Sequence, residues 1–572
     1  MLTIWGEKLN PQKVLQEYPR PQLRRDSYLN LNGLWEFSME PKTSAPLYAE
    51  QILVPFSPES ELSGIYRKKK AGERLYYRRT FTLPQGFFKG RLLLHFGGVD
   101  YACKVQINGA EAGRHEGGYW PFTLDITAFY KEGENVLTLE AEDEAPLEQK
   151  GAYGKQSETP GGIWYTAQSG IWQTVWLESV PRTYITGLTI TPQADKEEVL
   201  LRIHTNGDVP CRVELEGMVY AASPETPVHL PVEQVRLWSP DTPYLYDFAV
   251  SAGEDRVESY FALRSFTVEK DEEGVVRLCL NHKPFFFTGV LDQGYWSDGL
   301  YTPADDEAMV CDIQTMKAMG FNTLRKHVKI EPLRWYYHCD RMGMVVWQDM
   351  VSGGGPYKKS VIQFPLMGLP QRVDDGYAVF GREDKAGRKL YYKELRQTVE
   401  LLYNCPCIAL WTPFNEGWGQ FDALKAEKTV RSLDPTRLID HASGWHDQGG
   451  GDVYSRHVYY RAYRFRADPE GRRACVLSEF GGYTLGIPEH RYTEEKIYSY
   501  KKLDTEKAFT HAFRKLYLRQ ILPARAQGLC AAIYTQLSDV ESEINGLLTY
   551  DRKVLKIDPE TVKKINKALT ES

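Results

Sequence analysis

The sequence predicts a multidomain protein of β and α/β structure: a jelly-roll-like β-sandwich, an immunoglobulin-like β-sandwich and a C-terminal (β/α)8 TIM barrel. The chain has 572 residues, which is too long for a single hydrophobic core. Short alternating runs bounded by turn residues fill the first half, whereas apolar runs alternate with longer amphipathic stretches after Asn281. The first pattern is typical of antiparallel sandwiches and the second of a parallel barrel.

The N-terminal sandwich is expected over residues 1–181. Between Tyr28 and Val180 the strand-like runs are LYYRRTFTL, GRLLLHFGG, CKVQINGAEAG, NVLTLEAED and WQTVWLESV. Gly, Asn, Asp and Pro separate them, as in an all-β sandwich. A shorter series, EEVLLRIHT, CRVELEGMV and YLYDFAVSA, predicts the immunoglobulin-like sandwich over residues 182–270.

The catalytic barrel is expected over residues 271–572. Its eight strand candidates are FFFTGVL, FNTLRKHV, GMVVWQDM, CIALWTPFNE, RLIDHASG, DVYSRHVYY, ACVLSEFGG and GLCAAIYTQL. Helices are expected around Glu307 to Met319 and near Trp335. Active sites of such barrels lie at the carboxyl ends of the strands, so the polar residues after each run are the candidates.

Composition excludes some classes of partner. The formal net charge of -6 argues against nucleic acid and against an anionic membrane surface. The chain has no apolar run of 18 residues, so no membrane span is expected. The 13 Trp and 36 Tyr favour a carbohydrate ligand, because sugar rings stack on aromatic side chains, although an aromatic-rich core explains them equally well.

The same sequence favours a cytoplasmic protein. Residues 1–30 contain no apolar segment like that of a secretory signal, and Glu7 and Glu17 lie in this region. The nine cysteines are scattered and odd in number, which predicts free thiols. Only Cys405 and Cys407 are close together, without a nearby ligand cluster, so we expect no metal and no cofactor.

Two carboxylates end apolar runs in the predicted barrel. Glu416 closes ALWTPFNE and Glu479 lies in VLSEF, so both should project toward the barrel axis. A buried carboxylate without a partner is costly, and a salt-bridged barrel glutamate is the structural alternative for each. Glycoside cleavage needs such a pair, one carboxyl to protonate the leaving oxygen and one to attack the anomeric carbon.

Five segments in order carry a family resemblance: AQSGIWQTVWLE, NHKPFFFTGV, FNTLRKH, FNEGWGQ and SEFGG. They resemble glycoside hydrolase family 2, which includes β-galactosidase, β-mannosidase and β-glucuronidase. The likeness runs from Asn32 to Arg552. It implies that Glu416 is the general acid/base on the fourth barrel strand and that Glu479 is the nucleophile on the seventh.

The resemblance also implies substrate-binding roles. Asn415 matches an asparagine that binds the sugar 2-hydroxyl. Tyr459 matches a tyrosine that hydrogen-bonds the nucleophile, with Tyr460 as the alternative. Arg325 and His327 match a pair in which the arginine keeps the nucleophile anionic; a barrel histidine without substrate contact is the alternative for His327. The resemblance also implies a sugar-binding-like role for the sandwich over residues 1–181. The remaining candidates at strand ends are Asp292, Trp347, Asp349, His441, Trp418 and Trp445, of which the last two serve equally well as packing between loops.

The sequence departs from the family pattern at several positions, so not every property of the family is expected here. The first strand ends in GVLDQGYW, so hydroxyl recognition there is expected to differ. The Asn-x-Lys motif that clamps a uronate in β-glucuronidases is not apparent after SEFGG. A buried substrate carboxylate requires a cationic partner, so a neutral sugar is favoured. The metal sites of the large β-galactosidases are not expected.

The sequence therefore predicts a retaining, β-galactosidase-like exo-glycosidase. β-Mannosidase, arabinosidase and β-glucuronidase specificities stay open. A carbohydrate-binding protein without catalysis is the alternative from another class, and both glutamates with their Asn and Arg neighbours weigh against it. Carbohydrate is the expected partner, and a homo-oligomer is compatible with the sequence.

Overall fold

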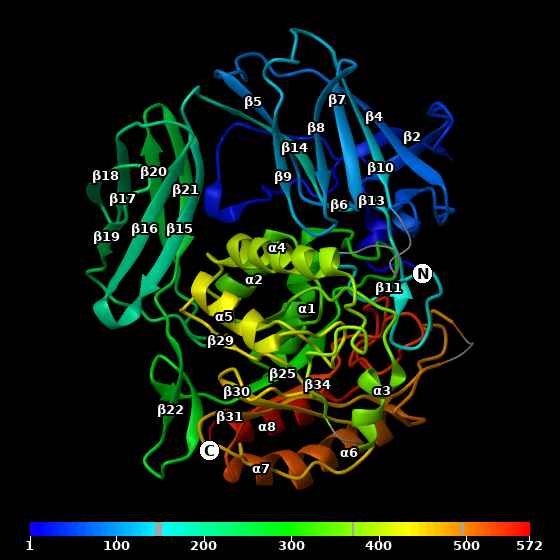
Figure 1. Ribbon diagram of the computed structural model, residues 1–572, viewed down its shortest axis with the longest axis vertical. Helices are drawn as coiled ribbons and strands as arrows, with labels where there is room; N and C mark the ends of the chain where they lie inside the picture. Colours follow the sequence, from blue (N-terminus) through cyan, green and yellow to red (C-terminus); the bar gives the residue numbers. More distant parts are fainter. Residues whose placement is uncertain (144–150, 369–370, 494–496, 572) are drawn as a thin grey trace.

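The computed structural model describes residues 1–143, 151–368, 371–493 and 497–571. Three β-rich parts follow one another along the chain, with the N-terminal sandwich above the barrel and the immunoglobulin-like sandwich beside it in Figure 1. The fold class predicted from sequence is confirmed. None of the helices in the described ranges combines the length and apolar character of a membrane span.

The N-terminal sandwich packs a six-stranded sheet, β3-β2-β4-β10-β7-β8, on a four-stranded sheet, β1-β14-β5-β9. Alternating side chains such as Trp35, Tyr77 and Leu94 fill the space between the sheets. Its strands are β1 (Tyr28–Asn30), β2 (Gly33–Pro41), β3 (Glu50–Val54), β4 (Glu73–Phe81), β5 (Arg91–Phe96), β6 (Val99–Asp100), β7 (Ala102–Ile107), β8 (Ala110–Glu116), β9 (Phe122–Asp125), β10 (Asn135–Glu142), β11 (Gln156–Ser157), β12 (Tyr165–Thr166), β13 (Gly170–Ile171) and β14 (Val175–Val180).

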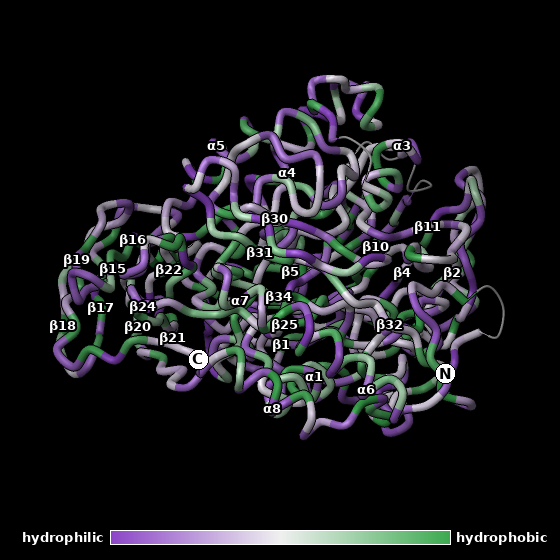
Figure 2. The backbone as a smooth tube through the Cα atoms, turned by 90° about the horizontal axis from the view of Figure 1, so that it is seen from below, coloured by the Kyte–Doolittle hydropathy of each residue, from purple (hydrophilic) through white to green (hydrophobic). Residues whose placement is uncertain are grey.

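The second sandwich has sheets β15-β16-β19 and β18-β17-β20-β21 and a hydrophobic core of its own. It forms a lobe at one end of the molecule when seen from below (Figure 2). Its strands are β15 (Ile185–Gln193), β16 (Glu198–Thr205), β17 (Cys211–Leu215), β18 (Met218–Ala222), β19 (Val228–Pro231), β20 (Tyr246–Ala252) and β21 (Asp255–Phe261). This is the arrangement of an immunoglobulin-like sandwich.

A hairpin leads from this lobe into the barrel. It consists of β22 (Phe266–Lys270), β23 (Val276–Leu280) and β24 (Lys283–Pro284). The Cys530 thiol, at the start of the last barrel strand, donates to the Val276 carbonyl over 3.4 Å. The hairpin therefore lies at the amino ends of the barrel strands, away from the end where a barrel site is built.

The barrel sheet has the order β29-β28-β27-β26-β25-β34-β31-β30, with parallel pairing throughout. Within the described residues, β29 and β30 share no ladder, so the barrel is nearly closed. All eight strands fall on the runs predicted from sequence, and only β25 extends beyond its run, by one residue. They are β25 (Phe287–Asp292), β26 (Thr323–Lys326), β27 (Val345–Asp349), β28 (Ile408–Thr412), β29 (Leu438–Ile439), β30 (Val453–Val458), β31 (Ala474–Gly481) and β34 (Leu529–Thr535). Between β31 and β34, the short strands β32 (Tyr483–Thr484) and β33 (Lys501–Lys502) pair in parallel.

Helices surround the barrel, and side-chain caps start several of them. Asp305, Asp384 and Asp558 accept backbone N–H bonds at the starts of α1, α4 and α8. The helices are α1 (Asp306–Ala318), α2 (Leu333–Met342), α3 (Lys359–Ile362), α4 (Lys385–Leu402), α5 (Ala423–Leu433), α6 (Glu506–Leu516), α7 (Leu522–Ala526) and α8 (Pro559–Thr570). In the part of the chain that is described, the connections after β29 and β30 carry no helix.

Candidate active site

The two predicted glutamates meet at the carboxyl ends of the barrel strands. Glu479 lies in β31, and Glu416 follows β28 by four residues. The Glu416 backbone has φ +50°, a left-handed conformation that costs an L-residue about 1–3 kcal/mol. Two hydrogen bonds hold it: Glu416 N donates to the Ser443 carbonyl at 3.0 Å, and Trp445 Nε1 donates to the Glu416 carbonyl at 2.9 Å.

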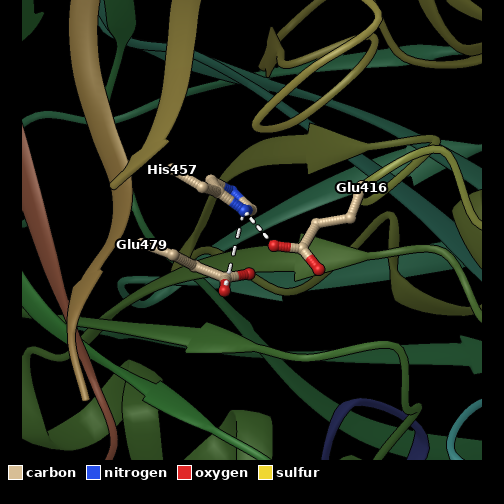
Figure 3. Close-up of side chains that lie close together, drawn as sticks. All are labelled: Glu416, His457 and Glu479. Atoms are coloured by element: carbon tan, nitrogen blue, oxygen red, sulfur yellow. Dashed lines mark hydrogen bonds and ion pairs between the residues drawn. The ribbon is translucent and has the colours of Figure 1, made fainter. Parts of the chain in front are cut away.

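A histidine bridges the two carboxyl groups (Figure 3). His457 Nδ1 lies 2.8 Å from Glu416 Oε1 and 3.6 Å from Glu479 Oε2. One carboxyl oxygen of each glutamate and a ring nitrogen of His457 all lie within 4.8 Å of one another. His457 lies in β30, within the run DVYSRHVYY, and was not among the site residues expected from sequence.

Glu479 is surrounded by groups that stabilise its anion. Arg325 Nη1 donates to Glu479 Oε1 at 3.1 Å, and the Tyr459 hydroxyl donates to Oε2. The His327 ring lies beside this carboxylate without stabilising its charge: its Nδ1–H donates to Gln293 Oε1, and the bare Nε2 lies 3.6 Å from Oε1. Tyr460 is 60% exposed, so of the two tyrosines considered from sequence only Tyr459 contacts this carboxylate.

Arg325 is fully buried and joins several site residues. Its Nε and Nη2 donate to the two carboxylate oxygens of Asp349, each at 3.1 Å, and Nη2 also donates to Asn415 Oδ1 at 2.7 Å. A buried guanidinium needs such bidentate carboxylate partners to offset its desolvation. Arg325 therefore holds both Asn415 and Glu479 in place.

The surroundings of Glu416 and Glu479 shift the pKa values of the two carboxyl groups to different extents. Burial raises the pKa of Glu416, and the negative charge of Glu479 raises it further. Burial also raises the pKa of Glu479, but Arg325, the Tyr459 hydrogen bond and Lys155 oppose this rise. The shared proton therefore resides on Glu416, as required of an acid facing an anionic nucleophile.

The two histidines beside these carboxyls are neutral. Burial lowers the pKa of His457 well below its usual range, and the nearby Arg325 lowers it further. The pKa of His327 is lowered by burial, with Lys155 and Arg325 adding to the shift. Neutral rings act here as hydrogen-bonding groups and add no charge to the site.

Glu416, His457 and Glu479 also form a group that could ligate a metal ion. The Arg325 guanidinium lies 3.1 Å from Glu479 and 3.3 Å from His457. This cation already supplies the positive charge that a metal would bring. The geometry is explained without an ion, and the absence of a metal stays a prediction.

The other predicted site residues fall into two groups. Trp418 lies close to the glutamates, with its ring 5.5 Å from that of His327. Three more contact other parts of the protein: Asp292 pairs with Lys326 at 2.6 Å, Trp347 packs 5.8 Å from Phe287 in the barrel core, and His441 lies 3.3 Å from Asp447. Substrate contact by these three stays a prediction.

Sequence reasoning missed a part of the site that comes from outside the barrel strands. Lys155, in the N-terminal sandwich region, is buried and interacts electrostatically with both Glu416 and Glu479. Its neighbour Glu543 lies in the loop after β34. Lys155 lies in no periodic segment, and Glu543 follows the last predicted strand run, so no local pattern gave either residue a role.

Three consecutive regions of the chain match models of known protein families. Residues 64–181 match the glycosyl hydrolases family 2 sugar binding domain. Residues 183–264 match the model described as glycosyl hydrolases family 2, and residues 273–500 match the TIM barrel domain of that family. Together the three matches cover most of both sandwiches and most of the barrel.

Individual relatives are distant. A β-galactosidase of Halalkalibacterium halodurans is 22% identical over 73% of this chain and 39% of its own length, and human β-glucuronidase is 23% identical over 90% and 85%. The chain spans less than half the length of the first curated relatives. The structure of a β-D-glucuronidase of Dictyoglomus thermophilum has the same fold, with a TM-score of 0.72, 18% identity and coverage of 96% and 98%.

Three models of one family match the chain in order, and the three parts of the fold correspond to them. The protein belongs to glycoside hydrolase family 2.

Proposed function

We propose that the protein is a retaining exo-β-glycosidase that removes a terminal neutral sugar, in the manner of a β-galactosidase. The observation that carries this proposal is the short distance between the two carboxyl groups, which have oxygens within 4.8 Å of each other. Retaining enzymes place their carboxyls about 5–5.5 Å apart, whereas inverting enzymes need about 6.5–9.5 Å to admit a water.

In the first step, Glu416 donates its proton to the glycosidic oxygen while Glu479 attacks the anomeric carbon. The C–O bond to the leaving group breaks, and an ester bond forms between the sugar and Glu479. In the second step, Glu416, now a carboxylate, removes a proton from water, which attacks the anomeric carbon and releases Glu479. Two inversions at one carbon retain its configuration.

Unpartnered donors beside the glutamates support a hydroxyl-rich ligand. Asn415 Nδ2 and Trp418 Nε1 are buried and have no hydrogen-bond partner within the described residues. A buried donor without a partner costs about 1–3 kcal/mol, which a sugar hydroxyl would offset. Family resemblance assigns the 2-hydroxyl to Asn415, a contact that strengthens as the transition state forms.

Variants of the two glutamates test the mechanism. Glu479→Gln removes the attacking carboxylate and is expected to abolish turnover of every glycoside. Glu416→Ala is expected to lower kcat/KM by about 10²–10⁴-fold for poor leaving groups, but much less for dinitrophenyl glycosides, which need no acid. With that substrate, the sugar–enzyme intermediate should accumulate as a burst, because its hydrolysis has lost the base.

Azide then distinguishes the two roles. It needs no deprotonation, so it should restore turnover of Glu416→Ala and give a glycosyl azide with the configuration of the substrate. An inverted first product from the wild-type enzyme would contradict the nucleophile role of Glu479. Binding of sugars without cleavage of any glycoside would favour the non-catalytic alternative.

A further inference from the structure

A segment of the N-terminal sandwich region is fixed between loops of the barrel. Tyr153 N and Gly154 N both donate to the Ser352 carbonyl after β27, at 3.0 and 2.9 Å. Further along, Thr166 N donates to Glu541 Oε1 at 2.9 Å in the loop after β34. These bonds hold the segment at both ends of the stretch that carries Lys155 and Tyr165.

Lys155 presents an ammonium group with spare donors. Its Nζ donates to the Tyr165 hydroxyl at 3.2 Å and lies 3.8 Å from Glu543 Oε2, beyond hydrogen-bonding distance. Tyr165 supplies its sole hydrogen-bond acceptor among the described residues, although an ammonium has three N–H donors. The side chain is 4% exposed, and Nζ lies 5.8 Å from the ring centre of Trp418.

Glu543 is a buried carboxylate with a fixed orientation. The Tyr165 hydroxyl donates to its Oε2, and Asn545 Nδ2 donates to its Oε1 at 3.0 Å. Each carboxylate oxygen has a second lone pair that can accept a bond from a ligand. Lys155 and Glu543 thus present donors and acceptors side by side.

Among the described residues, both cations beside the catalytic pair have a carboxylate partner. Arg325 is paired with Asp349 and Glu479, and Lys155 lies 3.8 Å from Glu543. A substrate carboxylate placed beside Lys155 would therefore also meet the negative charge of Glu543.

We propose that Lys155 and Glu543 form a donor–acceptor pair that binds hydroxyls of the terminal sugar, and that Glu543 excludes uronic acids. This inference rests on the proposed function and names the substrate class of the same site. An ammonium donates to one sugar oxygen while the carboxylate accepts from a neighbouring hydroxyl. Neutral sugars satisfy both groups, whereas a uronate satisfies only the first.

The first test compares neutral and anionic substrates. The ratio of kcat/KM for 4-nitrophenyl β-galacturonide to that for 4-nitrophenyl β-galactoside is measured for wild type, Glu543→Gln and Glu541→Gln, and likewise for the glucuronide and glucoside. Glu543→Gln should raise these ratios about tenfold or more, because repulsion of the substrate carboxylate is removed. Glu541 is a buried control in the same loop. Glu541→Gln keeps a side-chain oxygen that accepts from Thr166 N, so the segment stays anchored and the ratios should be unchanged.

The second test identifies a direct contact of Lys155 with the sugar. Lys155→Met should lower kcat/KM for the galactoside about 10- to 100-fold. The same comparison of Lys155→Met with wild type is made for 3-, 4- and 6-deoxygalactosides. The loss of kcat/KM should be about tenfold smaller for the analogue that lacks the hydroxyl contacted by Lys155. Thermal unfolding of each variant checks that it is folded.

The outcomes separate this inference from the proposed function. Equal losses of kcat/KM for all deoxygalactosides, or unchanged ratios of uronide to neutral glycoside in Glu543→Gln, would overturn the donor–acceptor pair. Neither result would contradict the proposed cleavage reaction. A wild type that cleaves β-galacturonide or β-glucuronide faster than the neutral glycosides would also overturn it. Absence of cleavage of every glycoside by wild type would remove the proposed function itself.

Discussion

The two sandwiches of this chain lie against the same barrel, but they make different kinds of contact with it. The N-terminal sandwich shares its packing with the barrel: Tyr119 and Trp172 belong to the barrel's hydrophobic cluster, and Trp120 Nε1 donates to Thr398 on α4 at 3.2 Å. The immunoglobulin-like sandwich adds Trp238 to the same cluster but meets the barrel at α2, where the Tyr260 hydroxyl and Trp238 Nε1 donate to the Asp340 carboxylate and carbonyl.

This difference shows that sheet class does not decide whether a domain contributes to the site. Both domains are antiparallel sandwiches. Only the first has an irregular segment that enters the carboxyl end of the barrel and carries Lys155 and Trp164 there. The second approaches a helix of the barrel wall, far from the loops that follow the strands.

The largest effect is expected at Gly154 in the N-terminal sandwich region, and Gly217 in the immunoglobulin-like sandwich is the control. Both glycines have positive φ. A Cβ at Gly154 would lie 2.8 Å from the Val328 carbonyl oxygen of the barrel, whereas nothing lies within 4 Å of a Cβ at Gly217 in the β17–β18 turn. Gly154→Ala should displace Lys155 and lower kcat/KM about 100-fold. Gly217→Ala should cost about 1 kcal/mol of unfolding free energy and leave kcat/KM unchanged.

Kinetics and thermal unfolding of both variants measure this contrast. A Gly154→Ala enzyme with wild-type activity would show that the segment has no part in the site. Loss of activity in both variants at equal stability would show that the two sandwiches do not differ as described.

A smaller effect is expected at an aromatic residue. The Trp164 ring lies 5.2 Å from Trp418 and 5.9 Å from Tyr357, which places it where an aryl leaving group could stack. Trp164→Ala should raise KM for aryl glycosides about five- to tenfold with little change in kcat. Tyr244→Ala, at an exposed aromatic of the other sandwich, is the control and should change neither constant.

KM values for aryl and methyl glycosides test this prediction, because a methyl group offers no ring to stack. An equal rise for both substrates would contradict a leaving-group contact and would indicate a packing role instead.

The smallest effect is a shift of the pH profile. Burial raises the pKa of Glu479, and Arg325, Tyr459 and Lys155 lower it. Lys155→Met removes one cation, so the pKa of Glu479 should rise and the acid limb of kcat/KM should move to higher pH. Lys155 also lowers the pKa of Glu416, so the alkaline limb should move in the same direction.

A shift of about 0.5–1 unit is expected for a charge that is near but not in contact. Arg256→Met removes a cation from the immunoglobulin-like sandwich, where Arg256 pairs with Glu214 at the surface, and should leave both limbs in place. A profile that moves to lower pH in Lys155→Met would contradict the electrostatic role.

Local sequence patterns predicted the barrel strands and the site residues that lie at strand ends. The eight strand runs and α1 were readable because buried parallel strands are continuous apolar stretches and the intervening helices are amphipathic. Glu416, Glu479 and Arg325 each follow or end such a run, so strand topology alone brings them to one end of the barrel. The distances between them required the structure.

Trp347 shows the limit of that reasoning. Side chains two residues apart share one face of a strand, so Trp347 and Asp349 differ in depth along the barrel and not in the side to which they point. Asp349 contacts Arg325, whereas Trp347 packs in the barrel core. The sequence predicted the strand but not which residues of its end reach the substrate.

The sequence by itself determined the three-part fold, the family and the two glutamates, because each depends on periodicity or on a contiguous motif. Tertiary structure alone decided that Lys155 and Glu543 lie at the site and that His457 bridges the carboxyls. Tyr165 and Glu543, for example, form a hydrogen bond although they are 378 residues apart. Such contacts arise from the packing of irregular segments, whose position depends on long-range contacts that leave no local pattern in the chain.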